Sequence, residues 1–218
     1  MTIEILTLGE PFFSISIIRD ETEYEIKDKT ILLNLSEQMI NIKDQALGAL
    51  QSYIVKDVAI KNIEHALIVE GFAKHADDDA LMQQIRQKWS SAYEMRGEER
   101  LRGVEHYMSP KIWVGQYGFT LYHSASVPLK VGLHKDHAFC PVAGFHEVHT
   151  QIIGFGKMQQ CKEKDINTLY LEESMAPGNT HKPIYDAEGN YPWHQYETIT
   201  PSVFLAVEIL PDGATPPA

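Results

Sequence analysis

Short apolar runs separated by turn residues dominate the first 35 positions of the chain. They cover residues 3–8, 12–18 and 30–35, and acidic or Gly-Pro segments lie between them. Runs of this length, rich in β-branched side chains and bounded by turn residues, are typical of strands. The chain is therefore expected to open with β-structure.

Two later stretches have helical periodicity. Residues 36 to about 54 carry apolar side chains at three- and four-residue steps, which favours a helical region. A clearer helix is predicted from about Asp78 to Arg96, with Gly97 as its C-cap. The apolar face of that helix consists of Leu81, Ile85, Trp89 and Tyr93. This face should pack on a sheet.

From about residue 105 the sequence consists of short β-rich runs separated by Gly, Pro and Asn. These runs cover residues 112–122, 127–133, 147–159, 168–175 and 203–210. Repeated short strands without helices between them predict an antiparallel sandwich or small barrel. We therefore expect a mainly β protein with an N-terminal α+β extension at 1–104 that packs on a barrel at 105–210. A loose tail is expected at 211–218.

Composition narrows the possible partners. The chain has 218 residues with 44% hydrophobic content, enough to bury a sizeable core. Its formal net charge is −11, with 19 Lys and Arg against 30 Asp and Glu, so a nucleic-acid partner is not expected. An anionic substrate would need its own local Arg or Lys.

The N-terminus carries acid early and lacks the basic start and long apolar centre of a secretory signal. No apolar stretch approaches the length of a membrane span. We therefore predict a soluble, cytoplasmic protein without a membrane partner. Cys140 and Cys161 are the only cysteines and form no CxxC pair, so they are expected to be reduced thiols.

Histidines concentrate in the second half of the chain, where seven of the ten lie from His123 to His194. In a strand, side chains two residues apart share a face, so Glu147, His149 and Gln151 should point the same way. Imidazole and carboxylate groups are costly to bury without a partner, and a bound cation satisfies both. A divalent-metal site is predicted on this face.

Between about residues 105 and 210 the chain resembles the cupin superfamily. The residues that carry the resemblance are Gly132-x-His134, Glu147 with Gly154 after six further residues, and Pro177-Gly178-x-x-His181. The resemblance implies a double-stranded β-helix, or jelly-roll, barrel that holds one divalent metal per chain. It also implies a homodimer.

In the first of two possible arrangements, His134 and Glu147 lie on the two arms of a hairpin, so that His134 faces His149. The implied metal ligands are then His134, Glu147, His149 and His181. Of these, His134, Glu147 and His149 are also the predicted catalytic residues. Such a shell leaves one or two positions open for water or substrate.

The competing arrangement uses His134, Asp136 and His181, which is the two-histidine, one-carboxylate triad of non-haem Fe(II) oxygenases. No Arg follows His181 to hold the carboxylate of 2-oxoglutarate, which disfavours that cosubstrate. Whether Asp136, His137 or His149 completes the shell stays open at this point.

The segment that follows His181 contains Pro and Gly and is rich in polar aromatic side chains, so it is predicted to be a loop. Its aromatic residues are Tyr185, Tyr191, Trp193, His194 and Tyr196. Such a loop could lie over the barrel mouth as a lid, or pack on the surface. His194 is expected here and not among the ligands.

These features predict a metal-dependent enzyme that acts on a small molecule inside the barrel. A non-haem Fe(II) dioxygenase or hydroxylase is the first reading, because neutral imidazoles and a carboxylate suit Fe(II). The second reading is a Zn, Mn or Ni isomerase, epimerase or lyase acting on a small carbonyl compound. A cupin that binds a small molecule without catalysis is the third.

Overall fold

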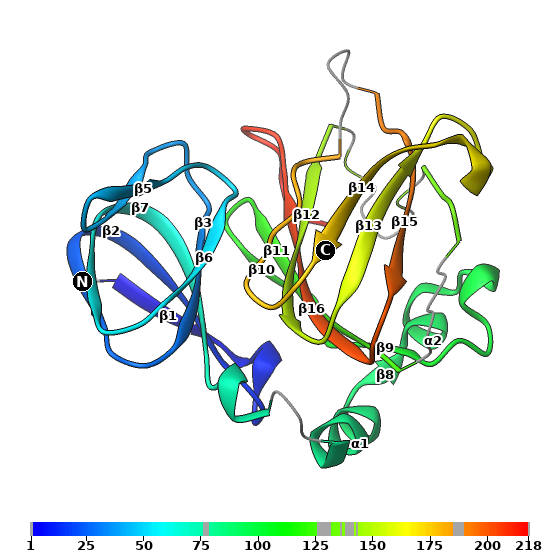
Figure 1. Ribbon diagram of the computed structural model, residues 1–218, viewed down its shortest axis with the longest axis horizontal. Coiled ribbons are helices and arrows are strands. Elements are labelled where there is room, and N and C mark those ends of the chain that lie inside the picture. Colours follow the sequence, from blue (N-terminus) through cyan, green and yellow to red (C-terminus); the bar gives the residue numbers. More distant parts are fainter. Residues whose placement is uncertain are drawn as a thin grey trace.

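The structure is a computed structural model that describes residues 2–75, 79–125, 132–135, 137, 142, 144–184 and 190–217. Two β bodies lie side by side, the first in blue to cyan and the second in green to red (Figure 1). Antiparallel pairing joins the strands within every sheet of these described residues. The predicted mainly β class is confirmed.

The first body is built from one coiled sheet, called sheet A here. Its strands are β1 (Thr2–Leu6), β2 (Ser14–Ile26), β3 (Thr30–Asn34), β4 (Ile40–Ile42), β5 (Gln45–Leu47), β6 (Ser52–Val55) and β7 (Val58–Glu70). The strand order is β1-β2-β7-β3-β6, and β4 pairs with both β5 and β7. The long strands β2 and β7 form the centre of this sheet.

The second body consists of two sheets that face each other. Sheet B contains β8 (Ser90–Ser91), β9 (His106–Met108), β10 (Ile112–Val114), β11 (Tyr117–Ser124), β12 (His146–Ile153) and β16 (Ser202–Ile209). Sheet C contains β13 (Gly156–Cys161), β14 (Leu169–Met175) and β15 (Trp193–Thr198). Their orders are β12-β16-β11-β9-β8, with β10 beside β11, and β14-β13-β15.

Helical structure is short. It comprises α1 (Asp79–Lys88), α2 (Ala92–Arg96), and the 3-10 turns η1 (Thr7–Gly9), η2 (Phe72–His75), η3 (Glu99–Leu101) and η4 (Ile166–Thr168). Among the described residues, none of these helices is long and apolar enough to cross a membrane.

The single helix predicted over residues 78–96 is interrupted. Ser90 and Ser91 pair with β9, and a capping box then starts a second helix, because Ser91 and Glu94 satisfy each other's backbone N–H groups. Gly97 ends α2 in the left-handed region with φ of 66°, as predicted for a C-cap. The expected packing face is confirmed at Leu81, which is buried together with Ile85 and Trp89.

The helix expected over residues 36–54 is wrong, because β4, β5 and β6 occupy this stretch. Leu47 is fully buried, whereas Ala46 and Ile54 are exposed, so the three- and four-residue spacing does not mark one buried face. Lys43 and Leu50 have φ values of 54° and 55°, which end the local strands in tight turns. Strand pairing with β7 and β3 overrides the local pattern.

The two faces of sheet B pack against different sheets. Val148 and Leu205 point toward sheet A and share a core with Ile15 and Leu67. The alternate residues of the same strands point toward sheet C, where Phe204 packs with Met158, Tyr196 and other buried side chains. This period-two division confirms the predicted alternation along residues 145–151 and directs Glu147 and His149 into the interior of the second body.

Hydroxyl groups connect the first body to the segment that contains Gly178 and His181. The Ser52 hydroxyl on β6 donates to the carbonyl of Gly178 at 2.7 Å and lies 2.6 Å from the hydroxyl of Thr180. Thr180 in turn lies 2.7 Å from the Thr150 hydroxyl of β12 and forms an isolated bridge with that residue. The N-terminal part of the chain therefore holds the segment that carries His181.

Candidate metal centre

A cavity of about 50 Å³ lies between sheets B and C. Sheet B contributes Glu147 and His149 to its lining, sheet C contributes His194, and the segments outside the sheets contribute His134 and His137. Buried aromatic and aliphatic side chains form the remaining wall, and two arginines from the α2–η3 region complete it. This volume holds roughly three or four water-sized groups, so the cavity suits an ion with a compound of few atoms.

Backbone pairing sets two of these histidines beside each other. His134 and His194 form an isolated antiparallel bridge, with N···O distances of 3.1 and 3.0 Å between their backbones. Their ring centroids are 4.3 Å apart. The expected hairpin, in which His134 faces His149 across the arm that carries Glu147, is therefore wrong for the described residues: His134 pairs with β15.

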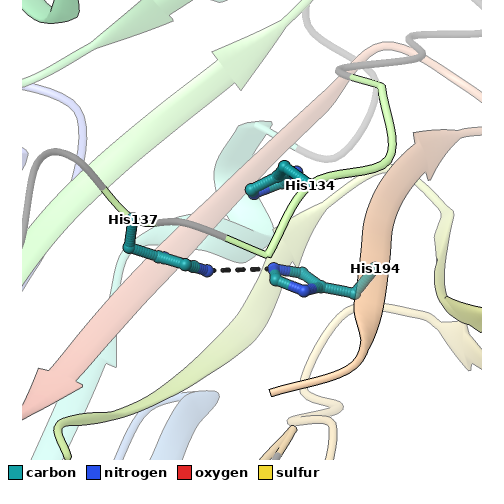
Figure 2. Close-up of side chains that lie close together, drawn as sticks. All are labelled: His134, His137 and His194. Atoms are coloured by element: carbon teal, nitrogen blue, oxygen red, sulfur yellow. Dashed lines mark hydrogen bonds between the residues drawn. The ribbon is translucent and has the colours of Figure 1, made fainter. Parts of the chain in front are cut away.

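His137 completes a cluster of three imidazoles. One ring nitrogen from each of His134, His137 and His194 lies within 4.8 Å of the other two. Figure 2 shows the three rings gathered around one point, with a dashed line between His137 and His194. The Nε2 atoms of these last two residues are 3.0 Å apart. This is the group of potential metal ligands that the described residues bring together.

Each of the three rings is anchored through its Nδ1 atom. Nδ1 of His134 lies 2.9 Å from the carbonyl oxygen of Gly132, and Nδ1 of His194 lies 3.0 Å from that of Pro192. Nδ1 of His137 lies 3.2 Å from Oε2 of Glu147. Carbonyl oxygens only accept hydrogen bonds, so Nδ1 of His134 and Nδ1 of His194 carry the ring protons, and the carboxylate of Glu147 favours the same tautomer at His137.

The protonation pattern leaves Nε2 as the lone-pair nitrogen of each neutral ring. Burial and the neighbouring histidines lower the pKa of His194 to about 4 and the pKa of His134 to about 2. Burial also lowers the pKa of His137. Near neutral pH no proton is therefore available for the 3.0 Å gap between the two Nε2 atoms. A cation at this point satisfies lone pairs that otherwise repel one another, so the residues fit a metal ion.

Glu147 is buried behind this cluster and contacts two histidines. Its carboxylate is 3.2 Å from Nδ1 of His137 and 3.6 Å from Nε2 of His149. Burial alone would raise the pKa of Glu147, but its interactions with the adjacent imidazoles of His137 and His149 lower it well below its usual range. The carboxylate is thus ionised, and its contact with His137 has the geometry of a carboxylate that orients a metal-binding histidine.

His181 is fully buried, and both of its ring nitrogens have hydrogen-bond partners. Nδ1 donates to the carbonyl of Lys182 at 2.6 Å. Nε2 accepts the backbone N–H of His149 at 2.9 Å, so it has no lone pair left for a metal ion in this arrangement. His181 therefore fixes the backbone of β12 at His149.

The structure distributes the sequence-predicted ligands over two neighbouring places. His134 lies in the three-histidine cluster, and Glu147 and His149 line the same cavity. His181 lies outside the three-histidine cluster, and its ring contacts the ring of His149. Asp136 lies outside the described residues. The predicted set of His134, Glu147, His149 and His181 has not been tested by a bound metal and stays a prediction.

His194 is the residue that sequence reasoning placed elsewhere. The segment expected to be a loop contains β15, whose backbone pairs with β13. The sequence signal that could have placed His194 is an alternation with a period of two. His194, Tyr196 and Thr198 lie two residues apart, and all three are buried. Tyr191 also contacts the cluster, with its ring centroid 4.9 Å from that of His137. Tyr185 lies outside the described residues.

No protein-family model and no curated protein matches the chain. Among solved structures, it is similar to a cupin 2 conserved barrel domain protein from Leptotrichia buccalis, at 10% identity, with 96% of this chain and 88% of that chain covered and a TM-score of 0.34.

Two enzymes are also among the similar structures. A mutant of oxalate decarboxylase from Bacillus subtilis is 10% identical, with 97% of this chain and 74% of that chain covered and a TM-score of 0.38. A sugar phosphate isomerase of the cupin superfamily from Silicibacter pomeroyi is 18% identical, with 49% and 60% covered and a TM-score of 0.33. At these values the likeness carries no activity or substrate over to this chain.

Proposed function

We propose that the protein is a metal-dependent enzyme that holds one divalent ion on Nε2 of His134, His137 and His194. One observation carries the proposal: all three Nδ1 atoms face oxygen acceptors, and one ring nitrogen from each residue lies within 4.8 Å of the other two. Three protein ligands leave coordination positions open, as in catalytic metal sites. The substrate is a small molecule bound in the adjoining cavity.

In this proposal, the surrounding residues orient the ligands and hold the cavity wall in place. Glu147 lies 3.2 Å from Nδ1 of His137, and its negative charge favours the ring proton on that nitrogen, which leaves the lone pair on Nε2. His181 holds the backbone of β12, which keeps Glu147 and His149 at the cavity wall. When bound, a divalent ion supplies an electrophilic centre, and iron in addition supplies redox chemistry with dioxygen.

Our first choice of reaction is a dioxygenation or hydroxylation with Fe(II). Neutral imidazoles suit this ion, and the apolar wall around Phe204 and Met158 excludes water from the reacting groups. The isomerase or lyase alternative requires a base that gains and loses a proton near neutral pH. Glu147 and His149 line the cavity and are the side chains that would serve as this base.

The deciding experiment is metal analysis of protein purified without oxygen. We expect one ion per chain in the wild type and loss of most of it in His194→Ala and His137→Ala. His146→Ala is the matched control, because His146 precedes Glu147 on β12 but is exposed. Absence of stoichiometric metal in the folded wild type, after incubation with Fe(II), Zn(II), Mn(II) and Ni(II) in turn, would overturn the proposal.

Oxygen consumption then separates the reaction classes. We expect the iron-loaded protein to consume oxygen with a substrate from a panel of small molecules. Tightly bound zinc, without oxygen uptake but with turnover of a carbonyl compound, would favour the isomerase class instead. Metal binding without any turnover would favour the non-catalytic binding protein.

A further inference from the structure

Two arginines reach the cavity from outside the strands of the barrel. Arg96 is the last residue of α2, and Arg100 lies in η3. Both line the cavity that also contains His134 and His194. Gly97 reverses the chain between them with φ of 66°, which places the end of one helix and the following turn at the same wall.

A single carboxylate holds these two arginines together. Nε of Arg96 and an Nη atom of Arg100 each lie 2.5 Å from a different oxygen of Glu98. The side chain of Arg96 is 12% exposed and that of Glu98 is 16% exposed. The ion pairs to Glu98 fix both guanidinium groups at the cavity wall.

The charges of these arginines act on the metal centre. Arg100 is among the charges that lower the pKa of His134, after burial and His194. Arg96 contributes in the same way at His137, after burial and Glu147. Arg96 and Arg100 line the same cavity as the three histidines, so their positive charges act on a molecule bound there.

The formal charge of the cavity follows from these groups. The two arginines are balanced by Glu98 and Glu147 when the histidines are neutral, so a divalent ion leaves an excess of two positive charges. The chain as a whole has a net charge of −11, so this positive interior opposes the overall charge. A carboxylate anion reduces the excess to one positive charge, whereas a neutral or cationic substrate leaves or increases it.

We propose that the substrate is a small carboxylic acid, bound as its anion, and that Arg96 and Arg100 recognise its carboxylate. This inference rests on the proposed metal site and names the substrate class for it. Guanidinium groups bind carboxylates through paired N–H donors, and both of these guanidinium groups line the cavity. The cavity volume of about 50 Å³ limits the acid to a few non-hydrogen atoms.

The test uses cobalt-loaded protein and glycolate as the probe, with neutral glycolamide of the same shape as its comparison. Visible absorption of cobalt and calorimetry each report binding without requiring turnover. The variants are Arg96→Gln, Arg100→Gln and Arg100→Lys. Arg102→Gln is the matched control, because Arg102 directly follows η3 and is 63% exposed.

We expect glycolate to bind the wild type and Arg102→Gln equally, and to bind Arg100→Gln and Arg96→Gln about tenfold or more weakly. Arg100→Lys should fall between them, since it keeps the charge and loses the planar donor pair. Glycolamide should bind weakly to all of them. Circular dichroism and cobalt stoichiometry show whether each variant is folded with its metal site intact.

Equal glycolate affinity in the wild type, Arg96→Gln and Arg100→Gln, with cobalt bound in all, would overturn the substrate inference and leave the metal site standing. Glycolamide binding as tightly as glycolate would have the same meaning. Failure of cobalt to bind the wild type would overturn the metal site. Calorimetry of the metal-free protein with glycolate then tests the two arginines on their own.

Discussion

Nδ1 of His137 lies 3.2 Å from a carboxylate oxygen of Glu147, and this contact decides which nitrogen of the imidazole carries the proton. With Nδ1 protonated, Nε2 is the acceptor, and it faces Nε2 of His194 at 3.0 Å. A buried carboxylate thus sets the direction of a lone pair on the opposite side of the ring. The proposed metal affinity depends on this relationship as much as on the three histidines themselves.

Glu147→Gln should therefore weaken metal binding without unfolding the protein. The amide keeps the shape of the side chain but loses the charge that attracts the Nδ1 proton of His137. We expect the metal affinity to fall about 10- to 100-fold, as is typical when such a partner is removed. Competition with a chromophoric chelator measures this change. Glu172→Gln, at a partly exposed position paired with Lys157 on sheet C, should leave the affinity unchanged.

His181→Ala separates the two ligand sets. If His134, His137 and His194 hold the metal, the variant keeps one ion per chain. Its stability should fall by about 1–3 kcal/mol, because the backbone N–H of His149 loses its acceptor. Metal analysis and urea denaturation of the same sample give both values. Loss of the ion in a folded variant would instead support the set that contains His181.

Stability should fall as the solution is acidified. Burial lowers the pKa of His106 from 6.5 to about 3, and burial also lowers the pKa of His123 to about 4. Between pH 6.5 and these lower values the unfolded chain binds protons that the folded chain does not. Stability is therefore full above pH 6.5 and is lost as the pH falls.

Each such histidine contributes at most about 1.4 kcal/mol per pH unit within its window. Urea denaturation at a series of pH values between 7 and 4 measures the slope. His106→Gln keeps a partner for the Ser124 hydroxyl, which lies 2.7 Å from Nδ1 of His106, and should make the slope shallower. An unchanged slope in this variant would contradict the assignment to His106.

Gly156→Ala should destabilise the cavity wall. A β-carbon at Gly156 would overlap the hydroxyl of Tyr196, which donates to Gln151 at 2.5 Å in the protein interior. We expect a loss of about 1–3 kcal/mol, the usual cost of overfilling a packed core. The ring carbon that bears the hydroxyl would also overlap this β-carbon, so Tyr196→Leu, which removes the ring, should reduce the additional loss caused by Gly156→Ala, and a double-mutant cycle in urea measures the coupling.

The features of the fold that could be predicted from the sequence are those that depend on local periodicity. Alternation placed Glu147 and His149 on the inner face of β12, and Gly97 was correctly identified as the end of a helix. The mainly β class followed from the density of short apolar runs. These features need only neighbouring residues, so one chain without relatives is enough to predict them.

The remaining part of the site depends on contacts between distant segments. His194 pairs with His134 because β15 and the segment around residue 134 lie side by side, which no local pattern reveals. Arg96 and Glu98 belong to a charged stretch that resembles an exposed helix end, yet both line or support a buried wall. The homodimer, the cytoplasmic location and the boundaries at residues 104 and 210 stay predictions.

The shared core between sheet A and sheet B has a consequence for how this protein can be divided. Val148 and Leu205 on the outer face of sheet B are covered by Ile15 and Leu67, so this sheet has no side that water solvates. A fragment that begins after the first body would present a continuous apolar surface and aggregate. The half that contains the three-histidine cluster is therefore not expected to fold without sheet A, so a transplanted fragment must include both.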